Sequence, residues 1–242
     1  MFEMGMMVSN SHINENKQMK VTKIIDAIQD IEGIHIEKLG AFTNYINEEN
    51  LGIFLTYRQI DIIKKPEFNS KINIKTYPYN TNSIGGWRQI YLTSDQDEML
   101  VKSVAFGAFV DLKSGLPKRI PRAVAKSIND YEADPNMQVL PRKIMIDNFE
   151  FKEVKQVLVE KSNIDRYRHL NNAYYVEFAA NTLKDINKYN RIRAEYLKPF
   201  VENDIIHLAI SNEINDEVIV TLSNNKGEVY AIVAFSYVKA MK

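Results

Sequence analysis

The stretch that decides the fold is MKVTKIIDAIQDIEGIHIEKLG, residues 19–40. Its apolar residues recur every three or four positions, which is the spacing of a helix with one buried face. They are Val21, Ile24, Ile25, Ile28, Ile31 and Leu39. Gly40 ends the pattern, because glycine is a common stop signal at the carboxyl end of a helix. The stretch therefore predicts an amphipathic helix of about five turns.

Strand-like sequence follows this helix. The runs are rich in β-branched residues, alternate in polarity and lie at 51–63, 71–77, 87–94 and 99–111. Turn signals such as Lys65-Pro66 and Gly85-Gly86 separate them. We expect an antiparallel sheet that covers the apolar face of the helix.

The same order recurs in the second half. A strand is predicted at 153–164 and a helix at 172–188, with Asn171 or Asn172 as its N-cap. Further strands are predicted at 191–197, 204–211, 217–223 and 228–239. Two matches support a duplication: VAFGAFV at 104–110 corresponds to VAFSYV at 233–238, and Pro66 to Pro199. We predict an α+β protein with similar halves at 1–120 and 151–242, joined by a linker at 121–150 that carries a short helix.

The composition excludes several classes of protein. The chain has 242 residues, 31 basic and 31 acidic side chains and no cysteine. Disulfides, thiolate metal sites and a cysteine nucleophile are therefore excluded. Balanced charge argues against binding to nucleic acid or to a membrane surface. No apolar run could span a bilayer and no secretory signal is visible, so we expect a soluble, cytoplasmic protein.

Polar residues gather in DRYRHLNN, residues 165–172, between the strand and the helix of the second half. Asp165 and His169 lie four apart in a loop, where a carboxylate can orient an imidazole. The helix start at Asn171 and Asn172 offers backbone N–H groups that can stabilise an oxyanion. The alternative is that Asp165 is a turn residue and His169 a solvated loop histidine.

Glu195, in the strand RIRAEYLKPF, is a second candidate for chemistry. Alignment of the halves on their prolines puts Ile62 in the place of Glu195, which favours one working site over two. The alternative is an exposed glutamate on a sheet face. No histidine pair has metal-ligand spacing, and neither a phosphate loop nor a G-x-S-x-G elbow is present.

Longer motifs at these positions resemble the acyl-acyl carrier protein (acyl-ACP) thioesterases of bacteria and plants. AIQDIEGIHIEKLG at 27–40 is similar to the family's first-helix pattern, and GAFVDLKSGLPKRIP at 107–121 to the end of its first domain. RAEY at 193–196 is similar to its glutamate-bearing strand. The family's loop D-x-N-x-H-[hydrophobic]-N-N-x-x-Y is matched at Asp165, His169, Leu170, Asn171, Asn172 and Tyr175. Tyr167 replaces an asparagine of plant members, and Tyr196 replaces a cysteine.

The resemblance implies two hot dog domains in tandem, each a long central helix wrapped by a curved antiparallel sheet. It implies hydrolysis of fatty acyl-ACP to free fatty acid and holo-ACP, without a cofactor or a metal. Glu195 would be the general base for water, assisted by His169 and Asp165. The repeat alignment makes Ile62 a candidate for the acyl pocket of the first domain.

The basic run Lys118, Arg119 and Arg122 is either a solvated linker or a docking site for the acidic carrier protein. Two other functions stay open, an acyl-CoA thioesterase of the same fold and a non-catalytic acyl-binding hot dog protein. We expect a monomer or a homodimer, because a tandem duplication can replace the dimer that single hot dog domains form.

Overall fold

A computed structural model of the chain describes residues 1–239. The chain forms two compact units. Unit 1 comprises Met1–Thr56 and Ile62–Val139, and unit 2 comprises Tyr57–Asp61 and Leu140–Lys242. The units thus divide within the predicted linker, and most of the carboxyl-terminal half of one strand, Leu51–Ile62, belongs to unit 2. The domain boundaries at 120 and 151 stay a prediction.

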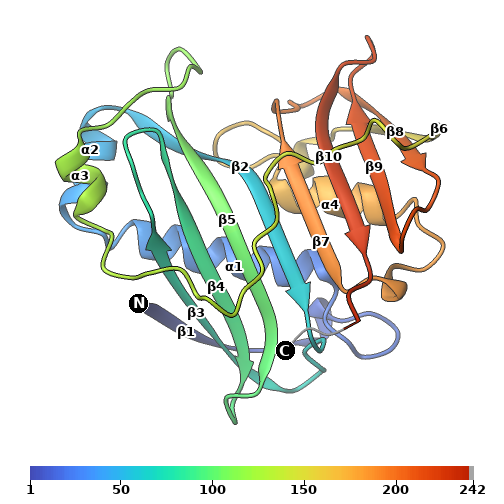
Figure 1. The fold of residues 1–242 in the computed structure, drawn as a ribbon, viewed down its shortest axis with the longest axis horizontal. Coiled ribbons are helices and arrows are strands. Elements are labelled where there is room, and N and C mark those ends of the chain that lie inside the picture. The colour runs from blue at the N-terminus through green and yellow to red at the C-terminus, as the bar shows by residue number, and fades with distance from the viewer. Residues whose placement is uncertain (240–242) are drawn as a thin grey trace. The chain divides into compact units, whose positions relative to one another are not determined.

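Unit 1 contains an antiparallel sheet and three α-helices (Figure 1). Its strands run in the order β1-β3-β4-β5-β2. The strands are β1 (Phe2–Met7), β2 (Leu51–Ile62), β3 (Lys71–Tyr79), β4 (Gly85–Ser94) and β5 (Met99–Asp111). The helices are α1 (Val21–Ile36), α2 (Ala41–Glu48) and α3 (Arg122–Lys126), with a 3₁₀ turn, η1, at Asn10–His12.

The helix predicted at residues 19–40 is present as α1, which packs on β3 and β1 and ends at Ile36, four residues earlier than predicted and before Leu39. Its predicted apolar face is buried at Ile24, Ile25, Ile28 and Ile31. Two elements were not predicted. Strand β1 alternates in burial, but its sequence FEMGMM has no β-branched residue. Helix α2 begins directly after Gly40, which has a positive φ of 56° and redirects the chain instead of ending the helical region.

Unit 2 repeats a strand, a 3₁₀ turn and a helix before its main sheet. Residues Tyr57–Asp61 of β2 pair with β7, and the order continues β10-β9-β8-β6. The strands are β6 (Phe151–Leu158), β7 (Arg191–Tyr196), β8 (Ile205–Ser211), β9 (Glu217–Ser223) and β10 (Val229–Ser236). The helical elements are η2 (Lys161–Asn163), α4 (Asn172–Ala180) and η3 (Ile186–Lys188).

Helix α4 is shorter than the predicted helix at 172–188. It ends at Ala180, and only a 3₁₀ turn, η3, follows. Polar side chains compete for the backbone at this point, since the Thr182 hydroxyl donates to the Ala179 carbonyl and Asp185 caps η3. The prediction of a long helix here was therefore wrong in its carboxyl-terminal half.

The two faces of the sheet in unit 2 have different partners. Helix α4 packs on β9 and β10. Ile144 lies against Ile219, Ile232 and Ala234, so the segment that follows Leu140 covers the opposite face. Figure 1 shows this segment and α4 on opposite sides of β7 and β10. Within residues 1–239, none of the helices is both long and apolar enough to cross a membrane.

Candidate functional site

The loop before α4 is shaped by Asp165. Its Oδ1 accepts hydrogen bonds from the backbone N–H groups of Tyr167 at 2.8 Å and His169 at 3.2 Å. The Asp165 N–H donates to the His169 carbonyl at 2.8 Å. Arg168, between them, takes the left-handed conformation with φ of 65°. These bonds hold His169, which is half-buried, at the entrance to the helix.

Asn171 is the N-cap of α4, which resolves the choice between the two predicted caps. Its side-chain oxygen accepts from the Ala173 N–H at 3.0 Å, and its carbonyl accepts from the Tyr174 N–H at 2.9 Å. The first amide that these two bonds leave open is that of Asn172. The predicted oxyanion stabiliser is therefore narrowed to this N–H group.

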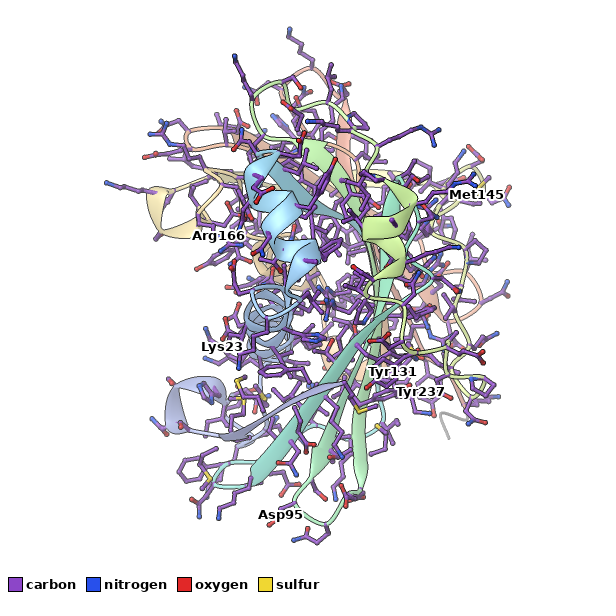
Figure 2. The ribbon with its side chains drawn as sticks, turned by 90° about the vertical axis from the view of Figure 1, so that its left-hand side faces the viewer. Lys23, Asp95, Tyr131, Met145, Arg166 and Tyr237 are labelled. Atoms are coloured by element: carbon purple, nitrogen blue, oxygen red, sulfur yellow. The ribbon has the colours of Figure 1, made fainter. Side chains whose placement is uncertain are left out.

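Tyr167, at the family's asparagine position, lies on the outer side of the loop. Its hydroxyl accepts a hydrogen bond from Arg166 Nη2 at 2.9 Å, and the Arg166 guanidinium lies 4.9 Å from the ring centre. Arg166 is exposed and projects from the molecule (Figure 2). Tyr167 thus contributes its backbone N–H to the Asp165 turn while its side chain pairs with a surface arginine.

Tyr196 lies beside the helix start. Its hydroxyl donates to the Asn172 carbonyl at 3.3 Å, and its ring meets the Tyr175 ring edge-on at a centroid distance of 5.3 Å. Burial raises the pKa of Tyr175 well above its usual range. The Tyr175 hydroxyl accepts the Phe200 N–H at 3.0 Å. The tyrosine at the plant cysteine position therefore supports the backbone from which α4 begins.

Glu195 points away from this cluster. Successive side chains on a strand face opposite sides, and Tyr196 faces α4. The Glu195 Oε2 atom accepts the Ile144 N–H at 2.8 Å, on the face that α4 does not cover. The structure thus brings Asp165, His169, Asn171 and Asn172 together with Tyr196, and it gives the Glu195 carboxylate a different neighbour. The catalytic roles of these residues stay predictions.

A loop with the same backbone pattern occurs in unit 1. Asn14 Oδ1 accepts the N–H groups of Asn16 and Gln18, each at 3.0 Å, and the Asn14 N–H donates to the Gln18 carbonyl at 2.9 Å. Lys17 takes the left-handed conformation with φ of 60°. Asn14 thus stands in the place of Asp165, and Gln18 in the place of His169.

The hydrogen bonds also correct the repeat alignment. The N–H groups of Ile63 and Lys64 both donate to the Leu100 carbonyl, as those of Leu197 and Lys198 both donate to the Tyr230 carbonyl. The counterpart of Glu195 is therefore Asp61. Alignment on the prolines was one residue out, because Pro66 shares its backbone role with Phe200: their carbonyls accept from Met19 and Leu170.

Both halves therefore carry a carboxylate at the position of Glu195. The argument for a single working site, which relied on an apolar counterpart of Glu195, is wrong. Ile62 itself is buried in unit 1. Its contact with an acyl chain stays a prediction.

The basic run divides into two parts. Lys118 Nζ lies 3.0 Å from Glu49 and 3.9 Å from Asp111, and its hydrogen bond with Glu49 raises the pKa of Lys118. The positive charge of Lys118 is therefore balanced by neighbouring carboxylates of the same unit. Arg119 and Arg122 are exposed, so they are the stronger candidates for docking. In residues 1–239, no group of three or more His, Asp and Glu side chains could hold a metal ion.

The family comparison matches residues 1–128 with the acyl-ACP thioesterase N-terminal domain. The fold is similar to a crystal structure of an acyl-ACP thioesterase from Bacteroides thetaiotaomicron, with a TM-score of 0.84 and 17% identity over 97% of this chain and 96% of that one. It is also similar to the 12:0-ACP thioesterase from Umbellularia californica, with a TM-score of 0.80 and 13% identity over 97% and 92%.

No curated protein matches the sequence. The structural likenesses, at these identities, establish the α+β fold, and the family match spans more than half of the chain. Membership supports thioester hydrolysis as the class of reaction. The chain belongs to the acyl-ACP thioesterase family.

Proposed function

We propose that this chain hydrolyses fatty acyl thioesters of ACP, releasing free fatty acid and holo-ACP without a cofactor. The observation that carries the proposal is the hydrogen-bonded loop from Asp165 to Asn172, which fixes the backbone of His169 three residues before the Asn172 N–H group at the start of α4, in a chain of this family. The enzyme would act in fatty acid biosynthesis in the cytoplasm, as a monomer or a homodimer.

The proposed architecture is two hot dog domains in tandem, at 1–120 and 151–242, with a linker at 121–150. Two features support it. Each unit has an antiparallel sheet with a helix preceded by a 3₁₀ turn, and the loops before α1 and α4 share their hydrogen bonds. The first domain would hold the acyl chain, with Ile62 on the pocket wall.

In the proposed reaction, His169 takes a proton from water as the water oxygen forms a bond to the thioester carbon. The carbonyl oxygen becomes an oxyanion, to which the Asn172 N–H donates at the positive end of α4. The C–S bond then breaks, and the imidazolium returns its proton to the leaving thiolate. The negative charge of Asp165 stabilises the imidazolium during the steps in which it is charged.

Two residues compete for the role of base. The sequence favours Glu195, whereas the contacts favour His169, since the Glu195 carboxylate accepts a hydrogen bond from Ile144 on the other side of β7. A base must come within hydrogen-bond reach of the water that it activates. We therefore assign proton transfer to His169, and the role of Glu195 is taken up below.

The experiment is release of free thiol from a panel of acyl-ACP substrates of different chain lengths, with the matching acyl-CoA thioesters alongside. We expect the chain to hydrolyse acyl-ACP with a higher kcat/KM than the matching acyl-CoA thioester. Preference for acyl-CoA would make the chain an acyl-CoA thioesterase of the same fold. Tight binding of acyl-ACP without thiol release would make it an acyl-binding protein, and either result would contradict the proposal.

A further inference from the structure

A row of polar side chains crosses the face of β2 and β7 that α4 does not cover. The strand register pairs Tyr57 with Glu195, Gln59 with Arg193 and Asp61 with Arg191. All except the half-buried Glu195 are buried. Burial of so many polar groups is unfavourable unless each is hydrogen-bonded. The row must therefore have partners.

One end of the row is a buried ion pair. Arg191 donates from Nε to Asp61 Oδ1 at 2.7 Å and from Nη2 to Asp61 Oδ2 at 2.8 Å. This two-bond arrangement is the strong form of an arginine–carboxylate contact. Gln59 Nε2 lies 3.3 Å from each oxygen of Asp61. The ion pair thus orients Gln59, whose oxygen is left to face the next partner.

The other partners are backbone groups of residues Leu140–Ile144, which we call the strap. Gln59 Oε1 accepts the Leu140 N–H at 3.0 Å, and Arg193 Nη2 donates to the Pro141 carbonyl at 2.8 Å. The Tyr57 hydroxyl lies 3.3 Å from the Leu140 carbonyl. The strap has no regular secondary structure. Side chains of the sheet therefore supply the hydrogen bonds that its backbone would otherwise lack.

Glu195 makes the last of these bonds, at the point where the strap enters the core. Its Oε2 accepts the Ile144 N–H at 2.8 Å, and the Ile144 side chain packs on Ile219, Ile232 and Ala234. The next residue, Met145, is exposed and points outward (Figure 2). Glu195 thus fixes the residue at which the strap changes from exposed to buried.

We propose that Glu195 is a positioning residue that anchors the strap to β7. Resting on the proposed function, this inference means that Glu195 serves hydrolysis through the strap, without touching the water or the thioester. The carboxylate and an amide are equivalent in this role, because each offers an oxygen to the Ile144 N–H. A carboxylate and an amide would differ if Glu195 were the general base, because the side chain of glutamine cannot accept a proton from water.

The test compares Glu195→Gln with Glu195→Ala, and uses Glu202→Gln, at an exposed glutamate, as the control for the change of charge. Two readouts are needed. The first is kcat and KM for acyl-ACP across pH. The second is the rate of limited trypsin cleavage after Arg142 and Lys143, which are exposed positions within the strap.

We expect Glu195→Gln to keep kcat within about threefold of the wild type and to keep the strap protected. Glu195→Ala should be cleaved about tenfold faster at the strap, because local opening exposes it. Its kcat should fall about tenfold, with a pH profile of unchanged shape. If the alanine variant does not fold, Glu195→Met takes its place, because it keeps the side-chain length and removes the acceptor.

Two results would overturn the inference. A loss of 100-fold or more in Glu195→Gln with an intact, protected strap would show that the carboxylate acts chemically. An unchanged cleavage rate in Glu195→Ala would show that there is no anchor. A wild-type chain that releases no thiol would end the proposed function instead, while the trypsin rates would still decide whether the anchor exists.

Discussion

The loops before α1 and α4 have the same backbone and different chemistry. In unit 1, Asn14 accepts two backbone N–H groups of its loop, and in unit 2 Asp165 does the same. Gln18 stands where unit 2 has His169. A neutral amide is therefore sufficient to build the turn, and an imidazole is not needed to end it.

This comparison separates structure from chemistry at Asp165 and His169. Unit 1 shows that the loop forms with one side-chain oxygen at position 14 and without an imidazole at position 18. What unit 2 adds is a negative charge and a group that can carry a proton. The substitutions Asp165→Asn and His169→Gln give the second loop the residues of the first, so they are expected to fold.

The largest effect is expected for His169→Gln. Removal of the group that transfers the proton should lower kcat at least 100-fold, while the melting temperature stays within about 2 °C, since Gln18 occupies the same backbone position in unit 1. Thiol release and a thermal melt check the two parts. The matched control is Gln18→His, which should leave kcat unchanged. Activity of His169→Gln within tenfold of the wild type would remove the imidazole from the mechanism.

Asp165→Asn should have the next largest effect. The amide oxygen can still accept the N–H groups of Tyr167 and His169, as Asn14 does for its own loop. Only the charge that stabilises the imidazolium is lost, so kcat should fall about 10- to 100-fold. Asn14→Asp is the control and should leave kcat as it is. An unfolded Asp165→Asn variant would show that the two loops are not equivalent.

Local patterns in the sequence predicted most of the fold and part of the site. The buried stripe of α1 and the strands after it follow from spacing, and Asp165, His169 and Asn171 meet because they lie within seven residues of sequence. The surroundings of Glu195 could not be predicted. They depend on which face of β7 it occupies and on a strap 51 residues away along the chain.

The alignment of the halves shows the same limit. A match of Pro66 with Pro199 is off by one residue, and in a strand a shift of one residue moves every side chain to the other face. It exchanged Asp61 for Ile62 as the counterpart of Glu195. The correct register between the two halves can be read from the backbone hydrogen bonds of the structure, but not from the amino-acid sequence.

If unit 1 lacks the chemical groups of unit 2, its exposed arginines can still serve the substrate. The double variant Arg119→Glu/Arg122→Glu should raise KM for acyl-ACP about fivefold and leave KM for a small acyl thioester unchanged, because charges at the rim of an interface mainly steer association. Lys226→Glu, an exposed charge reversal in unit 2, is the control. Equal effects on the two substrates would end the docking role.

The histidine of α1, His35, lies in surroundings that keep it neutral. Burial, with the Arg88 charge beside it, lowers the pKa of His35 to about 4. Its Nδ1 lies 2.8 Å from Arg88 Nη1, and its ring stacks on Phe2 at 5.3 Å. Between pH 6.5 and pH 4 the unfolded chain binds a proton here that the folded chain does not, so folding stability falls as the pH falls.

The loss across this window should be about 3 kcal/mol, measured by urea unfolding at a series of pH values. His35→Gln should flatten the pH dependence of the free energy of unfolding. A wild-type stability that stays constant from pH 6.5 to pH 4 would mean that His35 takes up its proton over the same pH range in both states, and it would contradict the prediction.

The smallest effect concerns the helix starts. Asn171 caps α4 with a side-chain hydrogen bond, whereas Lys20, at the same position before α1, makes no such bond. Asn171→Ala should therefore lower the free energy of unfolding by about 1 kcal/mol, and Lys20→Ala should change it by much less. Urea unfolding of the two variants measures the difference. Helix α1 has 16 residues and α4 has 9, so the shorter helix depends more on its cap. Equal losses in the two variants would show that the cap contributes nothing specific to α4, and the amide of Asn172 would then have to be held by the Asp165 turn and Tyr196 alone.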